Sequence, residues 1–147
     1  MISKGDQRYM KIGSDRREFS RLDIRVDCTL YLGNIEIICQ IRDISERGIC
    51  LLVDDEIVKQ NSIAVGTEME FQYADVYEYF NEKRKAIISG KCKIMRIVSS
   101  DMGTILGCVV ERGGKYEEYE EYVENRKVGE FVNSEMELFL WDKNANN

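Results

Sequence analysis

The sequence predicts a small, mostly-β domain, either an antiparallel barrel or a sandwich. Six segments alternate apolar and polar residues at the period of a β-strand, and connections of hairpin length join several of them. The chain has 147 residues, of which 44% are hydrophobic, so it has the size of one domain with one core.

The strands are expected in a regular order along the chain. The first covers Leu22–Leu32, where every second residue is apolar, and Gly33-Asn34 then predicts a hairpin turn into a strand over Ile35–Ile41. Four more strands are expected at Gly48–Val53, Thr67–Tyr73, Ala86–Val98 (with an irregularity near Met95) and Gly103–Glu111.

Two regions depart from this pattern. Residues Val76–Lys85 fit either a helical turn or a long hairpin tip, and both interpretations stay open. A helix is expected over Lys115–Lys127, where apolar and aromatic residues recur at spacings of three and four. After Gly129 the chain is rich in large apolar residues. This tail is expected to cover the barrel or to meet a second subunit, and it is compatible with a homodimer.

Cysteine and histidine usage narrows the function classes. The chain has no histidine and no CxxC pair, which argues against a zinc site, a disulfide framework and a catalytic triad. The cysteines are interpreted as small buried hydrophobic residues of the strands; they are Cys28, Cys39, Cys50, Cys92 and Cys108. The composition leaves carboxylate catalysis open as a third alternative, but no carboxylate pair stands out in an apolar setting. We therefore expect no catalytic residues, no metal and no cofactor, and we do not expect an enzyme.

The charge is distributed unevenly. The net charge is −6, but Met1–Arg25 holds seven basic residues against four acidic ones. An acidic protein is a poor binder of nucleic-acid polymers, whereas a basic N-terminal segment suits a small anionic ligand. No apolar run approaches the length of about 18 residues that a transmembrane helix needs, and the N-terminus lacks a signal-peptide pattern. We expect no membrane insertion and a cytoplasmic location.

Two clusters carry the binding chemistry. The first is the segment RREFSR before the first strand, in which Arg17 and Arg21 are four residues apart and share one side of the chain. Their guanidinium groups match phosphate, and they match guanine O6 and N7 equally well.

The second cluster is DISERG, between the second and third strands. Asp43 can accept hydrogen bonds from guanine, Ser45 can donate to phosphate or ribose oxygen, and Gly48 permits close approach to the backbone. Either cluster alone is also an ordinary solvated face or turn.

Together the two clusters resemble the signature of the PilZ domain family, which is RxxxR, a two-strand spacer and D/N-x-S-x-x-G. Arg17 and Arg21 match the first motif, and Asp43, Ser45 and Gly48 match the second. The similarity covers roughly residues 15–111, and the late strand ILGCVV also looks like the last barrel strand of the family.

The resemblance implies an all-β fold, a six-stranded antiparallel PilZ-type β-barrel with a C-terminal α-helix and an apolar tail. The implied domains are a flexible basic segment (1–15), the barrel (16–112) and the helix with its tail (115–142). It further implies a bacterial receptor for the second messenger cyclic di-GMP. In this receptor the ligand orders the RxxxR segment against the barrel and signals to an unidentified protein partner.

The same resemblance assigns roles to residues. Arg17 and Arg21 would hold guanine edges and phosphates, Asp43 and Ser45 would complete the guanine contacts, and Gly48 would leave room for the ligand. Arg16 lies directly before the first motif. In the family, an arginine at this place is associated with the binding of two stacked ligand molecules instead of one.

Two non-catalytic alternatives remain. One is a PilZ-like interaction module that binds no nucleotide, and the intact motifs count against it. The other is a barrel that binds single-stranded RNA, since arginine and tyrosine suit base stacking. The net charge of −6 and the lack of a strand face that is both aromatic and basic count against this alternative.

Overall fold

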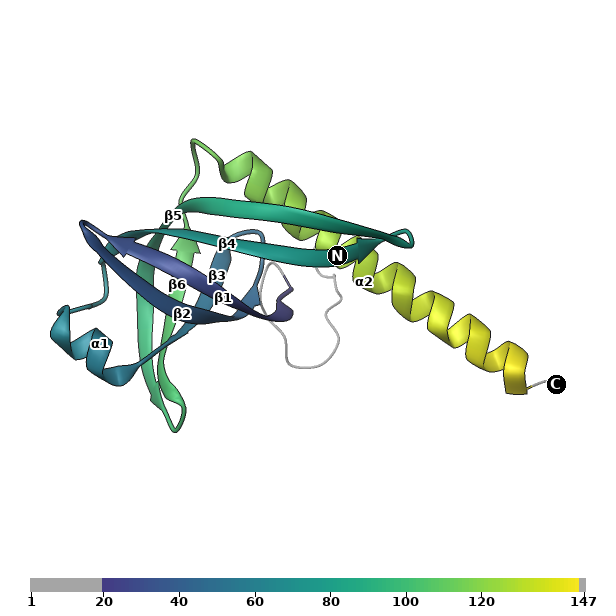
Figure 1. The fold of residues 1–147 in the computed structure, drawn as a ribbon, viewed down its shortest axis with the longest axis horizontal. Helices are drawn as coiled ribbons and strands as arrows, with labels where there is room; N and C mark the ends of the chain where they lie inside the picture. The colour runs from purple at the N-terminus through teal and green to yellow at the C-terminus, as the bar shows by residue number, and fades with distance from the viewer. Residues whose placement is uncertain (1–19, 146–147) are drawn as a thin grey trace, which may run out of the picture.

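The computed structural model describes the backbone of residues 20–145 and the side chains of residues 20–131. Within this part, six antiparallel strands close into a barrel in the order β1-β2-β3-β6-β5-β4 (Figure 1). The strands are β1 (Leu22–Leu32), β2 (Ile35–Ile44), β3 (Gly48–Val53), β4 (Glu68–Tyr79), β5 (Glu82–Ser100) and β6 (Gly103–Val110). This arrangement confirms the predicted fold class.

Every second residue of a strand faces inward, and these side chains fill the barrel interior. Leu30, Ile41, Phe71, Ile94 and Leu106 are among the residues that are at most 1% exposed. This alternation is the physical basis of the period-two pattern in the sequence. Four of the five cysteines also lie inside the barrel as free thiols, as expected, whereas the exception, on β3, is partly exposed.

The segment between β4 and β5 is a long hairpin, which resolves the open choice at residues 76–85. Pairing continues from Glu68 opposite Lys93 to Tyr79 opposite Glu82, and Phe80 and Asn81 form the tip with positive φ angles. The strand pattern was obscured because Asp75 points inward and is buried, while its apolar neighbour Val76 is 60% exposed. Polarity is thus inverted at this point of the alternation.

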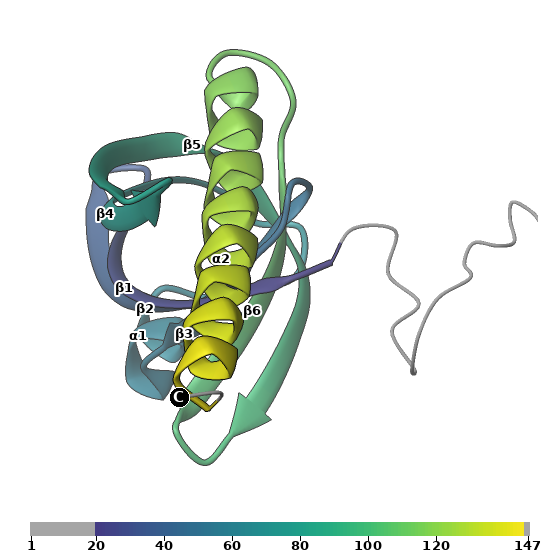
Figure 2. The same cartoon turned by 90° about the vertical axis from the view of Figure 1, so that its right-hand side faces the viewer.

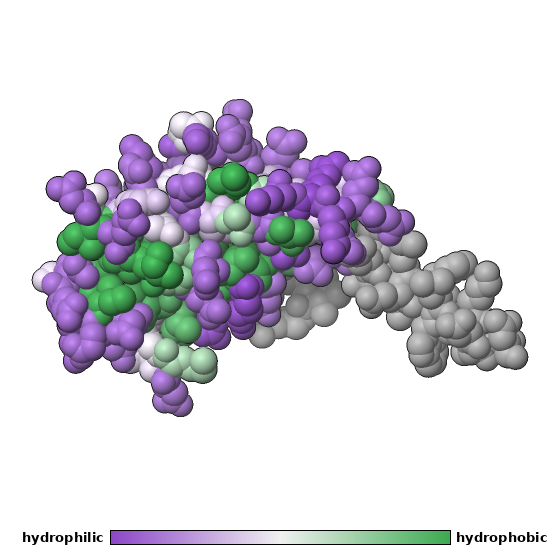
Figure 3. Space-filling view, in the orientation of Figure 1, coloured by the Kyte–Doolittle hydropathy of each residue, from purple (hydrophilic) through white to green (hydrophobic). Residues whose placement is uncertain are grey.

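A short helix, α1 (Asp55–Gln60), follows β3 and was not predicted. Its N-terminus is capped by the side chain of Asp54, which accepts a hydrogen bond from the backbone N–H of Glu56 at 2.8 Å. An acidic cap followed by Asp55 and Glu56 is a sequence signal for a helix start. Figure 3 shows an apolar area at this end of an otherwise largely polar face.

The C-terminal helix α2 (Tyr116–Ala145) is longer than predicted. It begins where the sequence indicated, and its buried face holds Tyr116, Tyr119, Tyr122 and Val123. However, it continues past Lys127, where the helix was expected to end, and through Gly129, so the following residues are part of the helix. Figure 2 shows α2 lying across the barrel, and in Figure 1 its C-terminal part projects beyond the strands.

The continuation through Gly129 has a steric reason. This glycine is buried, and a Cβ atom there would overlap the backbone carbonyl oxygen of Glu78 on β4. The absence of a side chain lets the helix approach the β4–β5 hairpin closely, so Gly129 serves packing and does not end the helix. The neighbouring Val128 and Phe131 are 40% and 66% exposed. The apolar side chains that follow lie outside the described part.

In residues 20–145, neither helix is both long and apolar enough to cross a membrane.

A Gly129→Ala substitution tests this packing. In an exposed helix the change would stabilise the fold by up to about 1 kcal/mol, because alanine has the higher helix propensity. Here we expect the clash with Glu78 to reverse the sign and to destabilise the protein by about 1–3 kcal/mol in urea unfolding. Val128→Ala, one residue away on the exposed side, serves as the control and should have little effect. A more stable Gly129→Ala variant would contradict the close approach.

Candidate ligand-binding site

The second motif forms a tight turn between β2 and β3. The Ser45 hydroxyl oxygen accepts a hydrogen bond from the backbone N–H of Gly48 at 3.1 Å, and the Ser45 N–H donates to the Gly48 carbonyl at 2.9 Å. Ser45 is only 4% exposed. Its side chain therefore holds the turn together, and within residues 20–131 its own O–H proton is not donated to another group.

Arg21 joins the first motif to the second. Its Nη1 atom donates to the Asp43 carboxylate at 2.8 Å, and the two side chains are 28% and 22% exposed. The guanidinium group also lies above Gly48, where an added Cβ would be 3.3 Å from Nη2 and 3.0 Å from the Cys108 carbonyl oxygen. Any side chain at Gly48 would crowd Arg21, so the glycine keeps this place open.

The structure thus brings together Arg21, Asp43, Ser45 and Gly48, four of the six residues singled out in the sequence. The other two, Arg16 and Arg17, lie outside the described residues.

Side chains of α2 also hydrogen-bond to the turn, and these contacts were not predicted from the sequence. The Tyr119 hydroxyl lies 2.7 Å from the Ser45 carbonyl oxygen and 3.0 Å from that of Gly48, so its single proton is shared between two acceptors. Tyr116 donates to the Glu46 carbonyl at 3.0 Å, and Lys127 pairs with the Glu46 carboxylate at 2.8 Å. No local pattern links a helical tyrosine to a turn about 70 residues earlier.

Tyr119 is suited to this role because it is 1% exposed. Burial raises the pKa of its hydroxyl well above the ordinary value, and the neighbouring Tyr122 acts in the same direction. The phenol therefore stays protonated at neutral pH and remains a hydrogen-bond donor.

A second polar contact fixes α2 to the barrel. Asp75 is 4% exposed, and its Oδ2 atom accepts hydrogen bonds from the Tyr122 hydroxyl at 2.7 Å and from Arg126 Nε at 2.9 Å. A buried carboxylate needs such partners, because leaving it without them would be costly. The helix is thus attached at the motif turn and at β4.

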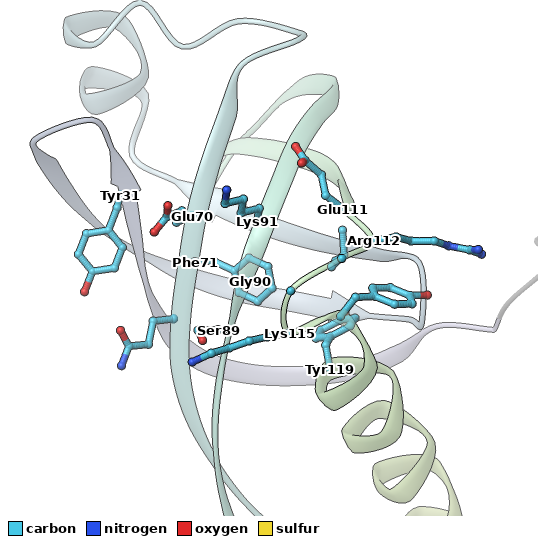
Figure 4. A pocket seen from close by; sticks show the side chains of 15 residues that line it. Tyr31, Glu70, Phe71, Ser89, Gly90, Lys91, Glu111, Arg112, Lys115 and Tyr119 are labelled. Atoms are coloured by element: carbon cyan, nitrogen blue, oxygen red, sulfur yellow. The ribbon is translucent and has the colours of Figure 1, made fainter.

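The motif residues do not line the cavity of about 520 Å³ shown in Figure 4. That cavity lies between β4, β5 and the loop before α2, and its floor includes Phe71, Gly90 and Tyr119. Its rim carries charges of both signs, among them Glu70 and Lys91. Tyr119 is the link between the two places, because its ring faces the cavity and its hydroxyl reaches the motif turn.

Cys50, on β3 directly opposite Asp43, is the one thiol that is partly exposed. Partial burial raises its pKa above the ordinary value, and the Asp43 carboxylate adds to this, while the charge of Arg21 opposes it. Among the described residues, no group of three or more His, Cys, Asp or Glu side chains could hold a metal ion.

Comparisons with known proteins bear on the family and the fold of the chain. A family model described as "PilZ domain" matches residues 15–124. No curated protein matches the sequence.

Two solved structures resemble the fold. The Bacillus subtilis inhibitor of motility (MotI/DgrA) is 18% identical with a TM-score of 0.58, and the match covers 78% of this chain and 53% of that chain. This chain thus spans about half the length of that protein. The PilZ domain of YcgR from Escherichia coli, solved with c-di-GMP, is 14% identical with a TM-score of 0.55, and the match covers 83% and 97% of the two chains. At these identities the similarity shows the fold alone.

Replacing Tyr119 by Phe should destabilise the protein by about 1–3 kcal/mol, because the Ser45 carbonyl would lose the Tyr119 donor and the Gly48 carbonyl would keep only the hydrogen bond from the Ser45 N–H. The matched control is Tyr73→Phe: the Tyr73 hydroxyl is buried near that of Tyr122, but within residues 20–131 it has no partner in hydrogen-bond geometry. Its removal should be neutral or slightly stabilising in the same urea titration. Equal effects of the two substitutions would show that the Tyr119 hydroxyl does not hold the turn.

Thiol labelling tests the placement of Cys50. We expect an aromatic disulfide reagent to modify one of the five thiols in the native chain and all five after unfolding. Because the pKa of this thiol is raised, its thiolate fraction is small near neutral pH, and the labelling rate should keep rising as the pH passes the ordinary thiol pKa. Cys50→Ser should abolish native-state labelling, and labelling of a second thiol would contradict the burial of the others.

Proposed function

The chain belongs to the PilZ domain family, and on this basis we propose that it is a non-catalytic receptor that binds cyclic di-GMP. The proposed contacts are Arg16, Arg17, Arg21, Asp43, Ser45 and Gly48. The observation that carries the proposal is the 2.8 Å contact between Arg21 and Asp43 above Gly48, because it joins the two motifs on one surface.

This surface has unused hydrogen-bonding capacity. A guanidinium group has five N–H donors, and the described contact of Arg21 with Asp43 uses one. The remaining donors can bind a phosphate or the O6 and N7 atoms of guanine, while the second carboxylate oxygen of Asp43 can accept from guanine N1–H and N2–H. The YcgR PilZ domain, with a similar fold, was solved with this ligand, which supports the assignment.

We further propose that binding is signalled through the motif turn. Arg16 and Arg17 would contact the ligand while it is bound to the barrel. The bound state would thereby gain contacts between the N-terminal segment and the ligand that the free state lacks. Two carbonyl groups of the same turn accept the Tyr119 hydroxyl, so a movement of the turn would change the contacts of α2. An exposed apolar surface at Val128 and Phe131 is available there for a protein partner.

Isothermal titration calorimetry of the full chain with cyclic di-GMP tests the function. Arg17→Ala and Arg21→Ala should each weaken binding by about 1–3 kcal/mol, because each removes a bidentate contact. A stoichiometry near two, falling to one in Arg16→Ala, would assign Arg16 to a second ligand molecule.

GTP is the control ligand and should not compete. Recovery of intact cyclic di-GMP after prolonged incubation is expected for a receptor, and its hydrolysis would show an enzyme. If the folded wild-type protein binds no cyclic di-GMP, the receptor function is wrong, and the alternative of an interaction module without nucleotide takes its place.

A further inference from the structure

An irregularity in β5 turns a further arginine, Arg96, toward the surface of the candidate site. The pairing of β5 with β6 shifts register between Ile94 and Arg96, with Met95 as the extra residue. In an unbroken strand Arg96 would follow Ile94 into the barrel; instead Met95 and Arg96 are both exposed. Bulges commonly re-aim a side chain in this way.

The register places Arg96 in line with the second motif. Asp43 on β2 is opposite Cys50 on β3, Cys50 is opposite Gly107 on β6, and Gly107 is opposite Arg96 on β5. Neighbouring strands are about 4.8 Å apart, so the backbones of Asp43 and Arg96 are about 14 Å apart across the sheet. This row runs over the outer face of the barrel, because Cys50 and Gly107 are both partly exposed.

The middle of the row is a floor of small residues. Gly48, Cys50 and Gly107 occupy neighbouring positions on β3 and β6, with Arg21 above Gly48 at one side. At the other side Arg96 leans over Gly107: a Cβ atom on Gly107 would be 3.6 Å from Arg96 Cβ and 3.7 Å from its Nε. The charges of Asp43, Arg21, Arg42 and Arg96 all affect the pKa of the Cys50 thiol, so Arg96 is one of several charged groups near it.

We propose that Arg96 is an additional ligand-binding residue, which contacts an acceptor group of cyclic di-GMP across the floor formed by Gly48, Cys50 and Gly107. This inference rests on the proposed function and extends it to a residue outside both motifs.

The chemistry of Arg96 suits that role. Arg21 is already paired with Asp43, whereas Arg96 forms no ion pair with any described residue. Its planar guanidinium group lies beside a low floor on which a flat base can rest. It can therefore donate two parallel hydrogen bonds to a phosphate or to the O6/N7 edge of guanine.

The test is calorimetric titration of full-length variants with cyclic di-GMP. Arg96→Ala should weaken binding roughly five- to hundredfold, the range for loss of one bidentate contact. Arg84→Ala is the matched control, because it removes the same charge from the same strand at the β4–β5 hairpin, where Arg84 lies over the Tyr79 ring. It should leave the affinity within about twofold, as expected for loss of one remote charge.

Two further variants identify the contact. Arg96→Lys keeps the charge, so it should retain most of the affinity if the acceptor is a phosphate and lose it if the acceptor is the guanine edge. Gly107→Ala fills the floor while making only ordinary van der Waals contacts, and it should weaken binding without lowering the melting temperature of the free protein.

The outcomes separate the two proposals. If Arg21→Ala weakens binding but Arg96→Ala binds like the wild type, the role of Arg96 is wrong and the receptor function stands. Equal weakening by Arg96→Ala and Arg84→Ala would also overturn the inference, because it would show a general charge effect. Absence of binding by the wild type would overturn both.

Discussion

The candidate site depends most on the contact between the Tyr119 hydroxyl group and the motif turn. This hydroxyl lies within hydrogen-bond distance of the carbonyl groups of both Ser45 and Gly48, and so it supports the turn that carries the second motif. The Ser45 side chain closes the same turn from within. Because these groups are buried, each of them needs its partner, and the turn has little freedom to rearrange while α2 is in place. Asp43 at the end of β2 is thereby presented to Arg21 in a defined position.

The helix α2 is therefore attached to the barrel at two places by polar contacts. The helix is attached at the motif turn by Tyr116, Tyr119 and Lys127, and at β4 by the contacts of Tyr122 and Arg126 with buried Asp75. Gly129 adds a close backbone approach to the same hairpin. These direct contacts connect the proposed ligand surface with the part of α2 that packs on the barrel.

The outer face of the barrel shows how strand irregularities shape a binding surface. Register shifts occur in β2 before Asp43 and in β5 before Arg96, so that both charged residues are displaced from a regular ladder. Between them lie Cys50 and Gly107, with Gly48 beside them under Arg21, and these small residues keep the surface low. A regular barrel with larger outward residues would offer neither the flat floor nor charged groups facing each other across it.

The sequence by itself determined the strands, most of the core and the pairing of two motifs that identifies the family, because alternation and fixed motif spacing are local properties of the chain. It left the β4–β5 hairpin open, since buried Asp75 and exposed Val76 invert the pattern. It ended the second helix at Lys127, whereas the helix continues to Ala145 and packs Gly129 against β4. Only the tertiary structure decided that Tyr119 supports the motif turn and that Arg96 shares the face of Arg21 and Asp43. Both depend on contacts between residues far apart in the chain, and such contacts follow from barrel closure and register, which no local pattern encodes.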